Sequence, residues 1–102
     1  MGTTDDRNDP GLRKISPATG MQETYLVLSD EERGKGFVRP VRRAYIHLRC
    51  GAATTMGLEI AETYARDPNF YGATFCSRCG NHFAVGEYGE FVWDGTDEKV
   101  GT

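Results

Sequence analysis

A stretch of apolar residues with helical spacing is the clearest pattern along the chain. Five apolar residues recur so that they share one side of a helix: Met56, Ile60, Ala61, Tyr64 and Ala65. On the outer side, Glu62 precedes Arg66 by four residues, a spacing that favours an ion pair. Pro68 follows Asp67, and the residue before a proline is disfavoured in helical geometry. The pattern therefore predicts a helix over residues 55–66.

Before this helix, shorter patterns predict a strand and a helical turn. Residues 24–28 are rich in β-branched and aromatic side chains, which favours a strand. Ser29 and Glu32 then have the spacing of a capping box, in which each side chain satisfies a backbone amide at the start of a helix. Gly34 and Gly36 follow closely, so we expect this helix to run for only a turn or two.

Two further regions have the patterns of extended chain. Residues 37–48 predict an extended arm that Pro40 interrupts, because proline cannot donate to a strand ladder. Alternation in the second half of the arm gives a more polar face and an apolar one. The more polar face holds Arg43, Tyr45 and His47, and the other holds Ala44, Ile46 and Leu48. Residues 82–85 and 90–93 predict a hairpin whose turn begins and ends with glycine.

The two ends of the chain lack such patterns. Residues 1–22 contain several glycines and prolines without periodicity, which predicts a flexible segment. Residues 94–102 predict a polar tail, so that residues 23–93 form a single domain. A chain of 102 residues with 38% hydrophobic residues has room for one modest core. We predict an α+β fold with three or four short antiparallel strands and one main helix.

Two half-sites of equal spacing carry the candidate chemistry. His47 and Cys50 are three positions apart, as are Cys76 and Cys79, and a glycine follows each pair. One imidazole nitrogen and three sulfurs complete the tetrahedral ligand set that zinc prefers. The glycine permits the positive φ that a sharp turn around a metal requires. The sequence therefore predicts one structural zinc ion, which would stabilise a small core.

His82 is an alternative fourth ligand, because it follows Cys79 by three residues. We favour His47, whose spacing to Cys50 repeats that of the other half-site. A redox dithiol at Cys76 and Cys79 is disfavoured. Such thiols lie at the start of a helix, which lowers their pKa, whereas the residues after Cys79 predict a strand.

A zinc deaminase would also use an upstream histidine and a downstream pair of cysteines. That chemistry needs a glutamate two positions after the histidine, and Arg49 stands there. Phe75, not proline, precedes Cys76. Cys50 would in addition close the coordination position that a catalytic water needs. We therefore predict a protein that is not an enzyme and has no catalytic residues.

With its two knuckles, each a ligand pair followed by glycine, the stretch from His47 to Trp93 resembles the zinc-ribbon class. This stretch is about half of the chain. The resemblance implies a small zinc ribbon, in which two knuckles hold one structural zinc beside a β-hairpin, and a module that binds nucleic acid or other proteins. The helix between the knuckles departs from many ribbons, which carry strands there. The short chain with weakly patterned ends is also similar to small zinc-ribbon proteins of phages and prophages.

Charge is distributed unevenly, although the net charge is only −3. Basic residues gather from residue 33 to residue 50 and at Arg78, whereas acidic residues gather elsewhere. Four arginines are candidates for phosphate contacts: Arg42, Arg43, Arg49 and Arg78. Tyr45 and Tyr71 are candidates for stacking on bases, although the small size of the domain favours a place in the core for Tyr45. A solvated face that offsets nearby acids is the alternative interpretation of the same cluster.

These observations predict a zinc-stabilised binding module that serves a phage or prophage as an accessory protein. Its expected partner is nucleic acid or a nucleic-acid-associated protein, and we expect no membrane contact and no small-molecule substrate. The alternative is a protein-interaction factor that inhibits a host protein or joins a virion, docking through the hairpin and the termini. Three cysteines without a disulfide framework favour a reducing compartment, so we expect the protein in the cytoplasm.

Overall fold

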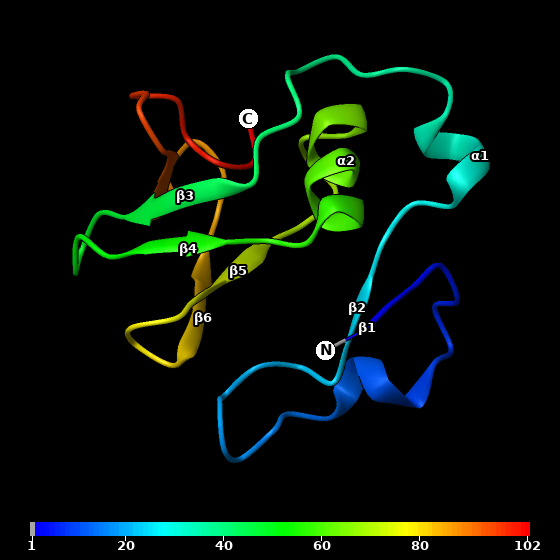
Figure 1. Cartoon of the computed structure of the whole chain (residues 1–102), viewed down its shortest axis with the longest axis horizontal. Coiled ribbons are helices and arrows are strands. Elements are labelled where there is room, and N and C mark those ends of the chain that lie inside the picture. The colour runs from blue at the N-terminus through cyan, green and yellow to red at the C-terminus, as the bar shows by residue number, and fades with distance from the viewer. Residues whose placement is uncertain (1) are drawn as a thin grey trace.

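A computed structural model describes residues 2–102 and has the α+β fold that the sequence predicts (Figure 1). In chain order, its elements are β1 (Gly2–Thr4), the 3-10 helix η1 (Pro10–Arg13), β2 (Thr24–Leu26), α1 (Asp30–Arg33), β3 (Ala44–His47), β4 (Ala53–Thr55), α2 (Leu58–Arg66), β5 (Ala73–Cys76), β6 (Asn81–Ala84) and β7 (Phe91–Trp93). Figure 1 shows α2 between the β3–β4 hairpin on one side and α1 with β1 and β2 on the other. None of the helices within residues 2–102 has the length and apolar content that crossing a bilayer requires.

The strands form three small sheets. β3 is the central strand of an antiparallel sheet in the order β4-β3-β7, and β5 pairs with β6 in an antiparallel hairpin. β1 and β2 form a parallel pair. The structure thus contains more strands than the three or four that the sequence predicts, and one pair of them is parallel.

The predicted hairpin between residues 82–85 and 90–93 is wrong. β6 pairs with β5, and β7 pairs with β3, with Tyr45 opposite Trp93 and His47 opposite Phe91. The physical reason is that the second half-site is itself the turn that joins β5 to β6. β6 already has its partner, so the next strand crosses to β3 and places its aromatic side chains in the core.

The alternation predicted for β3 is present, and the more polar of its two faces is the buried one. Tyr45 and His47, on the face that looks more polar in the sequence, are 2% and 0% exposed, whereas Leu48 is 54% exposed. The Tyr45 ring packs edge-on against Phe91 and Trp93. Its hydroxyl donates to the carbonyl of Phe75, so burial leaves this polar group satisfied. Tyr45 therefore belongs to the core and is not available to stack on a base.

α2 begins at Leu58, three residues later than predicted, because residues 53–55 pair with β3 instead. Gly57 occupies the N-cap position and Asp67 the C-cap position, next to Pro68 as expected. The predicted apolar side is buried: Met56, Ile60, Ala61, Tyr64 and Ala65 are all at most 7% exposed.

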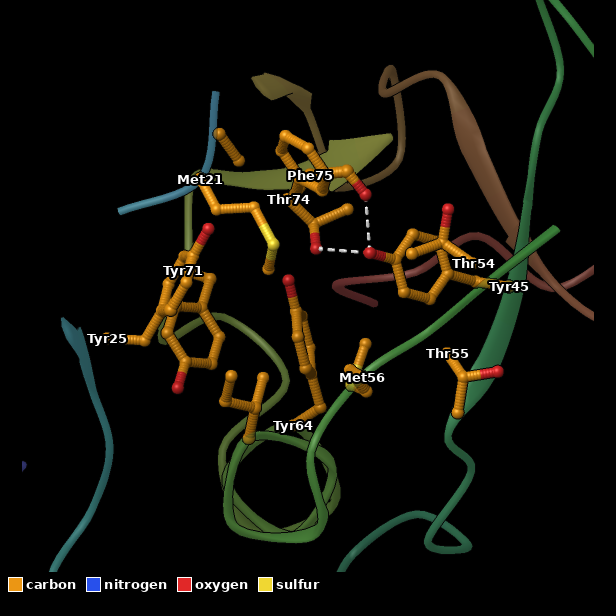
Figure 2. A pocket seen from close by; sticks show the side chains of 12 residues that line it. Met21, Tyr25, Tyr45, Thr54, Thr55, Met56, Tyr64, Tyr71, Thr74 and Phe75 are labelled. Carbon is orange, nitrogen blue, oxygen red and sulfur yellow. Dashed lines mark hydrogen bonds between the residues drawn. The ribbon is translucent and has the colours of Figure 1, made fainter. Parts of the chain in front are cut away.

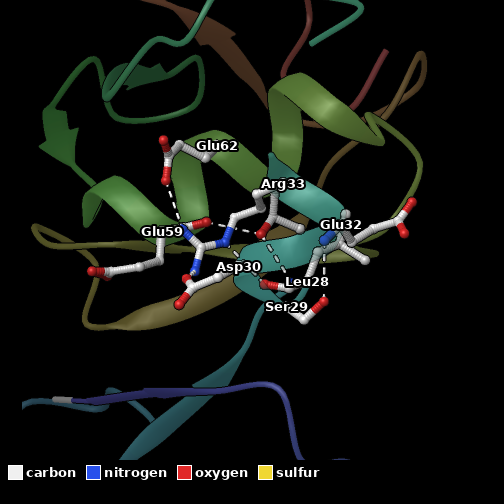
Figure 3. Close-up of polar contacts among 8 residues, drawn as sticks. Leu28, Ser29, Asp30, Glu32, Arg33, Glu59 and Glu62 are labelled. Carbon is white, nitrogen blue, oxygen red and sulfur yellow. Dashed lines mark hydrogen bonds and ion pairs between the residues drawn. The ribbon is translucent and has the colours of Figure 1, made fainter. Parts of the chain in front are cut away.

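Ion pairs join α1 to α2 rather than running along α2. The predicted pair of Glu62 with Arg66 does not form, because each residue finds a partner from α1. Arg33 donates to Glu62 at 2.7 Å and also contacts Asp30, as Figure 3 shows. Arg66 lies 3.5 Å from Glu32, and the hydroxyl of Ser29 caps α1 by accepting from the amide of Glu32. These contacts hold the short α1 against the main helix.

The N-terminal segment has regular structure where the sequence predicts a flexible segment. β1 lies beside β2 with Gly2 opposite Thr24, and Asp9 caps η1 by accepting from the amide of Gly11. The loop before β2 reaches the second half-site, where Gly20 has φ +81° and a Cβ on it would lie 2.0 Å from the Gly80 oxygen. Glycine at this position therefore allows the segment to pack on the domain.

The C-terminal residues are not a detached polar tail. Val100 is 0% exposed and joins the core cluster that contains Phe91 and Trp93. Its amide donates to the carbonyl of Phe91, and Gly86 donates to the carbonyl of Val100. The domain therefore extends past residue 93, because one valine in a polar stretch fills a place in the core.

We expect the substitution Val100→Ala to lower the free energy of unfolding by roughly 1–3 kcal/mol, because it removes buried methyl groups and leaves a cavity. The matched control is Val38→Ala, since Val38 is 58% exposed, and it should change stability by less than about 0.5 kcal/mol. Urea denaturation of both variants measures the difference. If the two variants have equal free energies of unfolding, residues 94–102 form a tail outside the core.

Candidate metal centre

The two half-sites are the turns of two hairpins. The first connects β3 to β4, so that His47 ends one strand and Cys50 lies in the turn. The second connects β5 to β6, with Cys76 at the end of a strand and Cys79 in the turn. Both turns lie on the left side of the molecule in Figure 1. Residues that are 26 positions or more apart in the sequence therefore meet at one place.

Both turns have the same backbone geometry. Gly51 and Gly80, which follow the second ligand of each pair, have φ of +75° and +66°. In each turn the glycine amide donates to the carbonyl of the first ligand residue, at 2.7 Å to His47 and 2.9 Å to Cys76. The amide of Cys79 also lies 3.5 Å from the sulfur of Cys76. The prediction that glycine permits a left-handed turn is confirmed in both half-sites.

The turns bring together four potential ligand atoms. One ring nitrogen of His47 and the sulfurs of Cys50, Cys76 and Cys79 all lie within 4.8 Å of one another. The Cys50 and Cys76 sulfurs are 3.5 Å apart, and Cys79 Sγ is 3.6 Å from His47 Nδ1. Tetrahedral zinc with bonds of about 2.0–2.3 Å separates its ligand atoms by roughly 3.5–3.8 Å. The group therefore fits one metal ion.

Aromatic rings and a carboxylate fix the orientation of His47. Its ring is stacked between Phe83 and Phe91, with centroid distances of 4.6 and 4.7 Å. Its Nε2 atom lies 2.9 Å from a carboxylate oxygen of Glu90, which leaves Nδ1 directed at the sulfurs. A carboxylate behind a ligand histidine selects the tautomer and makes the ring nitrogen a better donor to a metal.

Glu90 is a site residue that sequence analysis did not identify. It stands 43 positions from His47, and its oxygen also lies 3.2 Å from Arg49 Nε. The sequence gives no signal for this contact, because it depends on β7 crossing to pair with β3. Sequence analysis thus missed Glu90 for the same reason that it missed the pairing of β7 with β3.

His82, the alternative ligand, has another partner. Its Nε2 atom lies 2.8 Å from the hydroxyl of Tyr25, and its ring packs edge-on against Phe75. Partial burial lowers the pKa of His82, so the neutral ring is favoured. The contact joins β6 to β2, which gives His82 a role in holding the N-terminal segment.

The thiols do not ionise equally in the absence of a cation. The backbone amide of Ala52 stabilises the Cys50 thiolate and lowers its pKa to about 7. Loss of hydration, followed by the neighbouring Cys76 and Cys50 sulfurs, raises the pKa of Cys79 to about 11. One negative charge in the cluster therefore opposes the next, and a bound divalent cation would remove this repulsion.

The four candidate arginines do not form one surface. Arg42 and Arg43 precede β3, whereas Arg49 and Arg78 lie in the turns beyond the far ends of β3 and β5. Arg42 is largely buried, stacks over Trp93 at 4.8 Å and lies 3.1 Å from Glu98. Arg43 donates to the carbonyl of Met56. The Arg49 side chain stays 67% exposed despite its contact with Glu90, and Arg78 is exposed.

Comparison of the chain with protein-family models, with curated proteins and with solved structures gave no match. The assignment of the site therefore rests on its donor atoms and their geometry.

We expect the substitution Cys76→Ser to abolish metal binding and to lower the melting temperature, because Cys76 is the fully buried thiol of the group. Glu87→Gln, at an exposed position outside both half-sites, is the control. Native mass spectrometry of the purified protein, with and without chelator, measures metal content.

The same measurement tests the fourth ligand. His47→Ala should lose the metal, whereas His82→Ala should keep it, because His82 is bonded to Tyr25. The reverse result would assign the metal site to His82. If the purified protein carries no metal, and Cys76→Ser and the chelator leave the melting temperature unchanged, the group is a set of thiols without a metal.

Glu90→Ala should weaken metal affinity about 10- to 100-fold, because it removes the carboxylate that orients His47. Glu90→Gln should recover part of this loss, since its amide oxygen still accepts a hydrogen bond. The control is Glu87→Gln, an exposed residue of the neighbouring turn. Competition with a chromogenic chelator measures the affinities, and equal values for Glu90→Ala and Glu87→Gln would contradict the role of Glu90.

Proposed function

We propose that the chain is a small zinc ribbon whose single zinc ion is structural and whose two knuckles contact nucleic acid. Zinc is the metal that best suits three thiolates and an imidazole in tetrahedral arrangement. Four protein ligands within 4.8 Å leave no position for a reactive water. Glu90 lies on the side of His47 away from the sulfurs, so it orients the ring and is not placed to move protons at the metal.

The observation that carries this proposal is the matched position of Arg49 and Arg78. Each arginine directly precedes the second metal-binding cysteine of its knuckle, and both are exposed. The ion would fix the two hairpin turns relative to each other, and with them the spacing of the two guanidinium groups. Paired arginines at a fixed distance are suited to phosphate oxygens, which accept hydrogen bonds from the planar guanidinium.

Arg42 and Arg43 have a different role in this proposal. Arg42 covers Trp93 and neutralises Glu98, so its contribution is to stability. Arg43 is exposed but is anchored on Met56 at the other end of β3. A partner that spans both ends of β3 would contact Arg43 as well as the knuckles. A role in a phage or prophage stays a prediction that rests on the resemblance to the zinc-ribbon class.

The experiment is fluorescence anisotropy with labelled single- and double-stranded oligonucleotides at several salt concentrations. Arg78→Ala and Arg49→Ala should each weaken binding and reduce the slope of log K against log salt by about 0.9 on duplex DNA, because one phosphate contact is lost. The matched control is Arg39→Ala, which removes an exposed arginine near the C-terminus instead of the knuckles. The knuckles are ruled out as the contact surface if the affinity does not depend on salt concentration. They are also ruled out if all three variants weaken binding equally.

A second candidate function is docking on another protein through the turn before β7. Tyr88 in this turn is 93% exposed, which is unusual for a large aromatic side chain. Leu48 on the first knuckle is 54% exposed as well. A pull-down that survives nuclease and high salt but fails with Tyr88→Ala would favour this function over nucleic-acid binding.

A further inference from the structure

A small cavity lies beneath the loop that precedes β2, on the side of α2 that faces the sheets (Figure 2). Its free volume is about 40 Å³, which is room for a few water molecules. Four of its walls are tyrosines, namely Tyr25, Tyr45, Tyr64 and Tyr71. Met21 and Met56 also line it. Aromatic faces and flexible thioethers give this cavity an apolar but adaptable lining.

One hydroxyl in the cavity is left without a partner. The side chain of Tyr64 is 97% buried, since the residue is 3% exposed, and its Oη atom has no hydrogen-bond partner among residues 2–102. Figure 2 shows Tyr64 rising from α2 with its hydroxyl in the middle of the cavity. A hydroxyl that is buried without a partner is unfavourable, because it has lost its hydration and gained no hydrogen bond in return. A buried polar atom of this kind indicates a missing partner.

The other phenols of the cavity are already paired. The Tyr45 hydroxyl donates to the carbonyl of Phe75 and accepts from Thr74, and the Tyr71 hydroxyl donates to the carbonyl of Leu26. The Tyr25 hydroxyl is bonded to His82. Tyr64 is therefore the phenol that is free to donate to an added molecule. Burial raises its pKa, an effect that the neighbouring Thr74 hydroxyl partly offsets, so the phenol keeps its proton.

The lining also defines the charge of an added molecule. Among the described residues, the cavity walls consist of aromatic, aliphatic, thioether and hydroxyl side chains, without a charged group. An ion entering this space would lose its hydration and find no opposite charge. The cavity therefore selects uncharged molecules.

The Met21 side chain is the part of the cavity lining that can move. It belongs to the loop before β2, outside α2 and the sheets, and Figure 2 shows its side chain entering from the N-terminal segment, next to the Tyr64 hydroxyl. Methionine has three rotatable side-chain bonds, so it can withdraw without moving the backbone that Ser16 holds by a hydrogen bond to the Met21 carbonyl. Withdrawal would enlarge the cavity from the size of water to that of a single ring.

We propose that this cavity binds a small uncharged aromatic molecule with one oxygen acceptor, which takes the place of the Met21 side chain and accepts a hydrogen bond from Tyr64. Such a site differs from the metal centre and from the arginine pair, and the sequence did not predict it. The aromatic walls contact the faces of the ring, and the single free phenol fixes its orientation.

The test uses protein labelled with 13C at the methionine methyl groups, because Met21 and Met56 both line the cavity. Phenol is the probe, benzene is the analogue without an acceptor, and benzoate is the charged analogue. Phenol should shift both methyl signals with saturation, benzene should bind more weakly, and benzoate should leave the signals unchanged. The chain has three methionines, so the signals are assigned with Met21→Leu and Met56→Leu, and the remaining signal belongs to Met1.

Tyr64→Phe should weaken phenol binding roughly 3- to 10-fold while leaving benzene binding unchanged, since only phenol uses the hydroxyl. Tyr88→Phe is the matched control at an exposed tyrosine. If Tyr64→Phe fails to fold, the ratio of phenol to benzene affinity in the unaltered protein carries the same information.

A cavity that holds only water would give no saturable shift with phenol or benzene, even in Met21→Ala, whose larger opening removes the need for displacement. That result would overturn the proposal. Equal phenol affinity with and without the Tyr64 hydroxyl, or tight binding of benzoate, would overturn it as well.

Discussion

The convergence of two hairpin turns on one group of three sulfurs and one imidazole is the constraint on which the rest of the structure depends. The β3–β4 and β5–β6 hairpins belong to different sheets, and no strand pairing joins them. Their contacts at the tips are those among the potential ligand atoms and the hydrogen bonds of Ser77 with Thr54 and Ala53. A bound ion would therefore supply the cohesion between two sheets that a small core provides only in part.

The site also explains why the aromatic core is arranged as it is. His47 ends β3 between the rings of Phe83 and Phe91, so the imidazole is at once a ligand donor and a layer of the core. Tyr45 stands two residues earlier on the same face and packs on Phe91 and Trp93. The buried face of β3 thus runs without interruption from the hydrophobic core into the group of potential metal ligands, so the fold and the candidate site are built from the same residues.

Local chemistry made part of this structure predictable. The capping serine before α1, the proline after α2 and the two glycine turns depend on neighbouring residues, and the structure has each of them. Long-range pairing was not predictable in the same way. The sequence pattern predicts that residues 90–93 pair with residues 82–85, yet they pair with β3. The reason is that the second half-site forms the turn of the β5–β6 hairpin, so β6 already has a partner. Likewise, the burial of Val100 depends on a place in the core that no local pattern reveals.

Burial of polar groups separates the roles of residues that look alike in the sequence. Arg42 and Arg78 are both arginines near an apolar run, but Arg42 lies over Trp93 beside Glu98, and Arg78 is exposed next to a candidate ligand cysteine. The tyrosines divide in the same way, since Tyr45 has its hydrogen bonds and Tyr64 does not. A buried polar group whose hydrogen bonds are made stabilises the fold, whereas a hydrated surface charge or an unsatisfied buried hydroxyl can bond to another molecule. The two proposed binding sites rest on such groups, namely the exposed guanidinium groups of the knuckles and the hydroxyl of Tyr64 in the tyrosine cavity.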